Sequence, residues 1–231
     1  MNDWELMGVR ADTLYRYDPQ GRMLCTNEPE GQPAPRVFIG QTASGCVARF
    51  GQGVPNDLAL RVSNLLKNQP PRDPSPIPLS VLDAVRRLIE QQAPITRESG
   101  GPAYRFPESL APGRDVQQVT RDNVEVLREG HRWLYDTLED WWPCFAIVRD
   151  GAAVSICYSS RIGEAAAEAG VDTLPEHRGR GYASAVTAAW GAWIRASGRE
   201  PLYSTSWDNH SSQRVARRIG LFLFGADATF F

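Results

Sequence analysis

The feature that most constrains this chain is a glycine- and arginine-rich segment at residues 176–183, with the sequence EHRGRGYA. An apolar strand pattern precedes it over residues 167–174, and a helical pattern follows it over residues 182–196. Glycines at positions 179 and 181 let the main chain turn sharply where a side chain would obstruct it. The segment therefore predicts a strand–turn–helix unit in the second half of the chain.

This turn has the features of an anion-binding site. The first N–H groups of a helix have no partner within the helix, and the helix dipole adds partial positive charge there. Arg178 and Arg180 add formal charge. Such a turn suits a pyrophosphate group. The alternative stays open that this is a structural turn between a strand and a helix, made possible by its glycines, with solvent-exposed arginines.

Spacing separates this turn from two familiar phosphate-binding loops. A P-loop needs a Gly-Lys pair, and the sequence contains none. A dinucleotide fingerprint needs a third glycine or alanine where Ser184 stands, and it follows a first strand rather than a late one.

At this point the chain resembles the GNAT superfamily of N-acetyltransferases. That family's coenzyme A loop reads Arg/Gln-x-x-Gly-x-Gly/Ala, which Arg178, Gly181 and Ala183 match. Downstream, residues 207–212 and 219–221 are similar to the family's Asn-x-x-Ala/Ser and Gly-Phe segments. The two motifs occur in family order, and the resemblance covers residues 116–231.

The resemblance implies a fold, a co-substrate and a reaction. The expected fold is α+β, with a mixed, mostly antiparallel twisted sheet flanked by helices. The expected co-substrate is acetyl-CoA, whose acetyl group would move to a primary amine of a small molecule or amino compound. The implied cofactor-binding residues lie in the strand, the loop and the downstream helix: Val171, Asp172, Thr173, Arg178, Gly179, Arg180, Gly181, Tyr182, Ala183, Ser184, Asn209 and Ser212. For Asn209, a helix N-cap is an equally good interpretation.

The catalytic residues depart from the family pattern. Many relatives place a tyrosine acid seven residues after the motif asparagine, and this position is Ala216 here. By resemblance, Glu168 is the candidate base, with an outward-facing strand acid as its alternative. Tyr158, Tyr203 and His210 are the candidate proton donors. Otherwise the tyrosines are packed aromatics and the histidine is a solvated first-turn residue.

The acceptor side is predicted at a helix–strand junction where aromatic and acidic residues alternate. Such a surface suits a cationic or apolar amine through cation–π and charge contacts. Core packing with a solvated acidic face is the alternative. The candidates are Trp133, Tyr135, Asp136, Glu139, Asp140, Trp141 and Trp142.

The domain organisation follows from composition along the chain. Residues 1–92 predict a smaller N-terminal α+β module of unassigned role. Helices and two hairpins precede a proline-rich connector at residues 69–76, and one helix follows it. Residues 93–115 contain four prolines and three glycines within 93–113 and predict a linker. Residues 116–231 then form the GNAT-like domain.

Composition limits the remaining possibilities. A formal net charge of −2 argues against nucleic acid as a partner, and no apolar run reaches the ~20 residues of a membrane span. The four cysteines show no CxxC pair, and without an export signal they indicate reduced thiols in a cytoplasmic protein. We expect no metal site, and a homodimer is compatible with the sequence. Two other functions stay open: a non-catalytic acyl-CoA sensor and a protein acetyltransferase.

Overall fold

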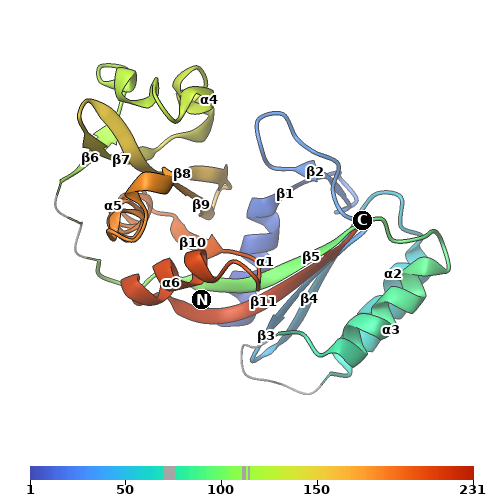
Figure 1. The fold of residues 1–231 in the computed structure, drawn as a ribbon. Helices are drawn as coiled ribbons and strands as arrows, with labels where there is room; N and C mark the ends of the chain where they lie inside the picture. The colour runs from blue at the N-terminus through green and yellow to red at the C-terminus, as the bar shows by residue number, and fades with distance from the viewer. Residues whose placement is uncertain (70–75, 111–112, 114) are drawn as a thin grey trace. The chain divides into compact units, whose positions relative to one another are not determined.

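The computed structural model describes residues 1–69, 76–110, 113 and 115–231 (Figure 1). Most of the proline-rich connector expected at residues 69–76 therefore lies outside the described residues. The chain divides into two compact units. Unit 1 comprises Met1–Tyr104, Ser204–Asn209 and Leu223–Phe231, and unit 2 comprises Arg105–Tyr203 and His210–Phe222.

Unit 1 contains a four-stranded arrangement in the order β4-β3-β11-β5 and a separate hairpin of β1 and β2. Strand β3 pairs antiparallel with both of its neighbours, so that Ile39 lies opposite Ala48 on one side and Ala228 on the other. The strand bounds are β1 Tyr15–Tyr17, β2 Met23–Thr26, β3 Val37–Thr42, β4 Gly45–Phe50, β5 Glu98–Arg105 and β11 Phe222–Phe230.

Helices cover both faces of these unit 1 strands. Val37 and Ile39 of β3 share one hydrophobic cluster with α2 (Asn56–Lys67) and α3 (Leu79–Glu90). On the other face, α1 (Asp3–Leu14) packs so closely that a Cβ at Gly40 would lie 2.3 Å from Met7. Only glycine fits at this position.

The helix starts of unit 1 differ in how they are capped. Asn2 and Glu5 form a reciprocal capping box at α1. At α3 the N-cap residue is Pro78, and no side chain caps the helix. Proline has no N–H to satisfy and its fixed φ is compatible with a helix start.

Unit 2 contains five strands in the order β10-β9-β8-β7-β6. Strands β9 and β10 run parallel, and the other three neighbouring pairs are antiparallel. The bounds are β6 Val116–Val119, β7 Cys144–Arg149, β8 Ala152–Ile162, β9 Ala166–Thr173 and β10 Glu200–Ser204. The predicted α+β class with a mixed, mostly antiparallel sheet is confirmed.

The two faces of the unit 2 sheet are covered differently (Figure 1). The long helix α5 (Tyr182–Ala196) covers one face, where Trp190 is fully buried and donates from Nε1 to the Ser159 hydroxyl at 3.0 Å. Three short helices cover the other, which we call the short-helix face: η1 Val124–Leu127, α4 Arg132–Tyr135 and η2 Leu138–Trp141. Their leucines pack on Ala146 and Ile156.

The domain limits expected from the sequence stay predictions. In the structure, residues 98–105 of the expected linker form β5, and β11 near the C-terminus pairs with β3 of the N-terminal half. Each unit therefore takes residues from distant parts of the chain. Among the described residues, no helix is long and apolar enough to cross a membrane.

Candidate functional site

The turn after β9 has the backbone geometry that its glycines predict. A short 3₁₀ helix, η3 (Pro175–His177), follows the strand, and Gly179 and Gly181 then adopt φ values of 78° and 83°. Gly181 is the N-cap residue of α5 and has a left-handed conformation. Residues with a Cβ rarely adopt this conformation, so both glycines are required by the turn. We call residues 178–184 the anion-binding turn.

The arginines of this turn fold back onto its own main chain. Arg178 donates from Nε to the Thr173 carbonyl at 3.1 Å, and Arg180 donates to the Glu176 carbonyl at 3.3 Å. Both side chains are exposed. Their charges therefore lie beside the start of α5, where the helix dipole is also positive.

Two further arginines, which the sequence analysis missed, lie near the same helix start. A Cβ at Gly181 would lie 2.8 Å from the guanidinium of Arg218 on α6 (His210–Ile219). Arg149 at the end of β7 lies 5.2 Å from the centre of the Tyr182 ring, and its hydrogen bond lowers the pKa of that phenol. The turn thus combines a helix N-terminus with several cations, which fits a pyrophosphate group.

Strand β9 leads into this turn, and beyond Glu168 it pairs with β8 on one side but not with β10 on the other. The pairing with β10 ends where Leu202 lies opposite Glu168, whereas the pairing with β8 continues to Thr173. Within unit 2, main-chain groups between residues 169 and 173 therefore remain available on the β10 side. Val171 and Thr173, for which pairing with a pantetheine arm stays a prediction, belong to this segment.

The side chain of Asp172 lies on the opposite face of β9 from those of Val171 and Thr173, because side chains alternate along a strand. Thr173 forms a hydrogen bond between its hydroxyl and that of Ser155 at 2.8 Å. Asp172 instead lies with Oδ2 at 3.4 Å from Nδ1 of His131, a histidine whose side chain is 0% exposed. The sequence offered no signal for this contact.

The downstream motif is divided between the two units. Asn209 belongs to unit 1 and directly precedes α6, whereas Ser212 belongs to unit 2 and lies in the first turn of α6. The Ser212 and Tyr203 hydroxyls are 2.6 Å apart. Tyr203 is buried, so its hydroxyl holds the start of α6 against β10. Ala216, at the family's tyrosine position, is also buried.

Tyr158, another proposed proton donor, belongs to an aromatic cluster on the short-helix face. Its ring centre lies 5.1 Å from that of Trp133 and 5.7 Å from that of Trp141, both edge-to-face. The ring also covers Gly170, where a Cβ would lie 2.4 Å from it. Burial, the largest cause, raises the pKa of Tyr158 to about 12. We call Trp133, Trp141 and Tyr158 the aromatic cluster.

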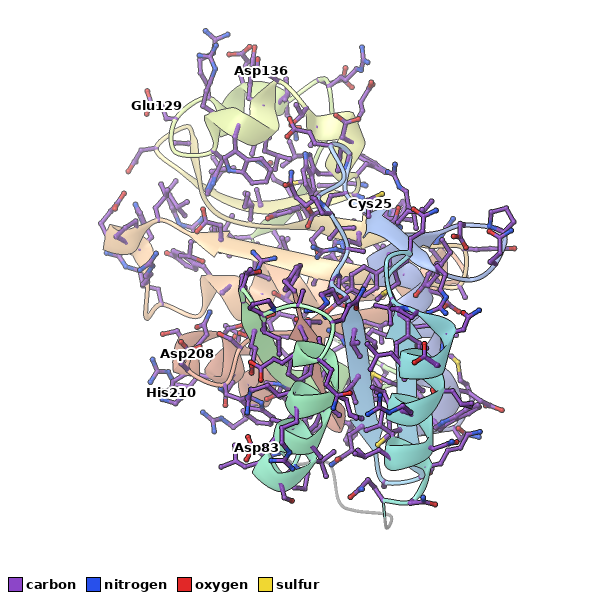
Figure 2. The ribbon with its side chains drawn as sticks, turned by 90° about the vertical axis from the view of Figure 1, so that its right-hand side faces the viewer. Cys25, Asp83, Glu129, Asp136, Asp208 and His210 are labelled. Carbon is purple, nitrogen blue, oxygen red and sulfur yellow. The ribbon has the colours of Figure 1, made fainter. Side chains whose placement is uncertain are left out.

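The acids expected beside these aromatics point elsewhere. Asp136 pairs with Arg132 at 3.5 Å and Glu139 pairs with Arg121, all on exposed side chains. Figure 2 shows Glu129 and Asp136 at the outer edge of the short-helix segment, away from the strands. Of the expected acceptor residues, the structure therefore brings together Trp133 and Trp141, but not these acids.

The remaining acceptor candidates also separate. Tyr135 donates its hydroxyl to Glu125 at 2.7 Å, and Trp142 packs against Trp193 of α5 with ring centres 6.2 Å apart. Glu168, the candidate base, is 2% exposed, so its alternative as an outward-facing strand acid is wrong. His210 begins α6 and is exposed.

The comparisons with known proteins agree with this geometry. Residues 143–224 match the sequence model described as GNAT acetyltransferase, a segment that includes β7 to β10, the anion-binding turn, α5 and α6. No curated protein gives a significant match.

Solved structures show the same fold at low sequence identity. A GCN5-related N-acetyltransferase from Kribbella flavida is 15% identical, with a TM-score of 0.52, over 100% of this chain and 95% of that chain. A GCN5-related N-acetyltransferase-like protein from Streptococcus suis 89/1591 is 18% identical, with a TM-score of 0.50, over 86% of this chain and 85% of that one.

The family match includes the turn between β9 and α5. The resemblance inferred from the motifs is confirmed over this segment: residues 143–224 are similar to the GNAT acetyltransferases, and the solved structures share the fold.

Proposed function

We propose that this protein transfers the acetyl group of acetyl-CoA to a primary amine of a small molecule or amino compound. The observation that carries the proposal is the anion-binding turn. Its glycines, Gly179 and Gly181, leave the N-terminus of α5 without covering side chains. The turn follows the part of β9 that lies beyond its pairing with β10. This arrangement offers main-chain N–H groups to a pyrophosphate and a parallel strand edge to a pantetheine arm.

The residues that would hold coenzyme A come from consecutive segments. Main-chain amides of residues 179–184 face the pyrophosphate, with Arg178, Arg180 and Arg218 supplying charge. Val171 and Thr173 supply main-chain groups for the pantetheine amides, and Ser212 extends the site along the arm. Acetyl-CoA supplies an activated thioester when bound.

The reaction balances without any other reagent. The neutral amine nitrogen forms a C–N bond with the acetyl carbon as the C–S bond breaks, and the thiolate leaves with the sulfur electron pair. The nitrogen loses one proton as it becomes an amide, and the thiolate takes up one proton. Because a free alkylamine has a pKa of ~10.4, the ammonium must first lose a proton. Positioning the two reactants contributes up to ~7–11 kcal/mol to lowering the barrier.

Two measurements on the intact chain test this proposal. Isothermal titration with coenzyme A and acetyl-CoA should give saturable binding. Thiol release should then depend on both acetyl-CoA and an added amine, measured against blanks without amine. Absence of coenzyme A binding at high micromolar concentration would exclude the proposal.

One observation favours a second candidate, a non-catalytic acyl-CoA sensor. The position of the family's tyrosine acid is Ala216, which is buried and offers no proton donor. Under this alternative, the chain binds coenzyme A but releases no thiol with any amine. Saturable thiol release with one amine would eliminate it.

A further inference from the structure

A fully buried imidazole lies directly behind the carboxylate of Asp172. His131 precedes α4, and its Nδ1 lies 3.4 Å from Asp172 Oδ2. Within the described residues, neither ring nitrogen makes a hydrogen bond of good geometry. Because a buried polar group without a partner costs free energy, this ring depends on the Asp172 carboxylate and on the main chain of Ala153, both of which act on it.

Asp172 connects this buried ring to the accessible part of the site. Its side chain is 48% exposed, whereas that of His131 is 0% exposed. On the short-helix face, Ile156 lies opposite Asp172 and Tyr158 lies opposite Gly170. Asp172 is therefore two residues along β9 from Gly170, which the Tyr158 ring covers, and on the same face of the sheet.

Several groups of the described residues act on this pair. Burial lowers the pKa of His131, while Asp172 from β9 and the main chain of Ala153 from β8 act in the opposite direction. Tyr158 from β8 is an ionisable neighbour of Asp172, and Arg161 acts on Tyr158 from the same strand. A histidine with a lowered pKa is neutral at pH 7, so one of its ring nitrogens carries a proton that it can direct at a carboxylate.

We propose that Asp172, supported by His131, takes the proton from the acceptor's ammonium group. This inference rests on the proposed acetyltransferase function and deepens it. Asp172 is then a catalytic residue, and His131 is a positioning residue that acts through it. The aromatic cluster beside the carboxylate suits a primary ammonium carried on an apolar or aromatic group.

The proton transfer is balanced at each atom. The ammonium nitrogen gives one proton to a carboxylate oxygen of Asp172 and becomes a neutral amine. The His131 ring stays neutral, because its burial disfavours the imidazolium form. After the product leaves, Asp172 gives the proton to water and the carboxylate is restored.

Accessibility favours Asp172 over Glu168, the base expected from the sequence. Glu168 lies four residues earlier on the same strand and is 2% exposed. An amine from solution can reach a half-exposed carboxylate directly, whereas a fully buried one is enclosed by protein. If Asp172 is the base, Asp172→Asn should lose more activity than Glu168→Gln. If Glu168 is the base, the order of the two losses should be reversed.

The test compares four variants of the full chain: Asp172→Asn, His131→Gln, Glu168→Gln and, as a matched control, Glu164→Gln. Glu164 is an exposed carboxylate in the turn between β8 and β9. Thiol release is followed with 2-phenylethylamine and n-butylamine between pH 5 and pH 9. Coenzyme A affinity and thermal melting are recorded for each variant.

General acid–base groups contribute about 10²–10⁴-fold, so Asp172→Asn should lose about 10²-fold in kcat/KM for the amine. Its coenzyme A affinity should stay within about threefold of wild type. His131→Gln should lower kcat about tenfold and leave KM for the amine near its wild-type value, because His131 positions the carboxylate and does not bind the amine. Glu164→Gln should match wild type.

A second readout needs no activity. In NMR titrations, Asp172→Asn should lower the pKa of the His131 ring, since the carboxylate charge is what raises it. An unchanged ring titration, Asp172→Asn activity within threefold of wild type, or a larger loss in Glu168→Gln than in Asp172→Asn would overturn the inference. If wild type binds coenzyme A but acetylates no amine, the proposed function fails and this inference falls with it.

Discussion

The anion-binding turn and the short-helix face both involve strand β9 of unit 2, but they are built in different ways. The turn follows the end of β9, whereas the short-helix face is one face of the sheet that contains it. The turn is made of consecutive residues, and its chemistry comes from main-chain N–H groups exposed by Gly179 and Gly181. The short-helix face assembles Trp133, Trp141, Tyr158, His131 and Asp172 from three separate segments.

This difference determines what each region tolerates. A site made from main-chain groups depends on backbone conformation, so most side-chain changes near it have little effect and a change at its glycines has a large one. A site made from side chains of distant segments depends on burial and packing. Because the residues there contact one another, the effects of substituting them are coupled and do not simply add.

The largest effect is expected at the turn itself, with Gly181→Asp. Its φ of 83° strains any side chain, its Cβ would lie 2.8 Å from the Arg218 guanidinium, and its carboxylate would occupy the anion site. We expect coenzyme A affinity to fall more than about 100-fold, measured by isothermal titration.

A matched control is available at the other end of α5. Gly198 has a φ of 85° and open space around its missing Cβ. Gly198→Asp introduces the same strain and charge away from the turn, so its coenzyme A affinity should stay near that of wild type. Equal losses in both variants would contradict the assignment of the turn.

A smaller effect is expected from Arg218→Gln, which removes the α6 cation that faces Gly181. Charge-assisted hydrogen bonds contribute about 1.5–3 kcal/mol, and exposure reduces this, so coenzyme A affinity should fall about tenfold. The loss should shrink at high salt because exposed charges are screened. Arg217→Gln, one residue away on α6, serves as the control. If both variants lose equally, Arg218 has no specific contact with the ligand.

The aromatic cluster tests the comparison from the other side. A substitution there should weaken binding of the amine and leave coenzyme A affinity unchanged. Trp133 is 45% exposed and makes edge-to-face contacts worth about 0.5–1.5 kcal/mol each. Trp133→Ala should raise KM for 2-phenylethylamine about fivefold with unchanged coenzyme A affinity. Trp4→Ala, a similarly exposed tryptophan in unit 1, is the control. A rise in KM for acetyl-CoA instead would contradict the division between the two regions.

The smallest effect concerns stability and pH. Burial lowers the pKa of His131 below its usual value, so the unfolded chain binds a proton at higher pH than the folded chain. His131 therefore reduces stability as the pH falls below ~6.5. The free energy of unfolding, from urea titrations at pH 7.5 and 5.5, should fall more in wild type than in His131→Phe. Equal falls would show that the ring is protonated without cost in the folded protein.

Much of the unit 2 fold could be predicted from the sequence because its signals are local. The strand pattern, the two glycines and the helix of residues 182–196 reappear as β9, the anion-binding turn and α5. The sequence does not predict strand β6, because Gln117 and Gln118 interrupt its apolar pattern. The strand forms through its antiparallel pairing with β7, a long-range contact that local strand propensity does not reveal.

The acceptor side was predicted only in part. Trp133 and Trp141 do meet, because an aromatic-rich segment must bury some of its rings. The acids beside them in the sequence, Asp136 and Glu139, instead pair with arginines on the exposed side. Which face a short helix buries depends on what packs beneath it, and the sequence of the helix alone does not contain that information.

What the sequence by itself determined is the anion-binding turn and the family that this segment resembles, because glycines, helix starts and charges act within a few residues of one another. Only the tertiary structure decided which carboxylate lies beside the aromatic cluster. Strand pairing aligns Asp172 with Ile156 and Gly170 with Tyr158, and packing of the short helices buries His131 behind them. These contacts join residues far apart in the chain, and they exist only once the sheet has formed.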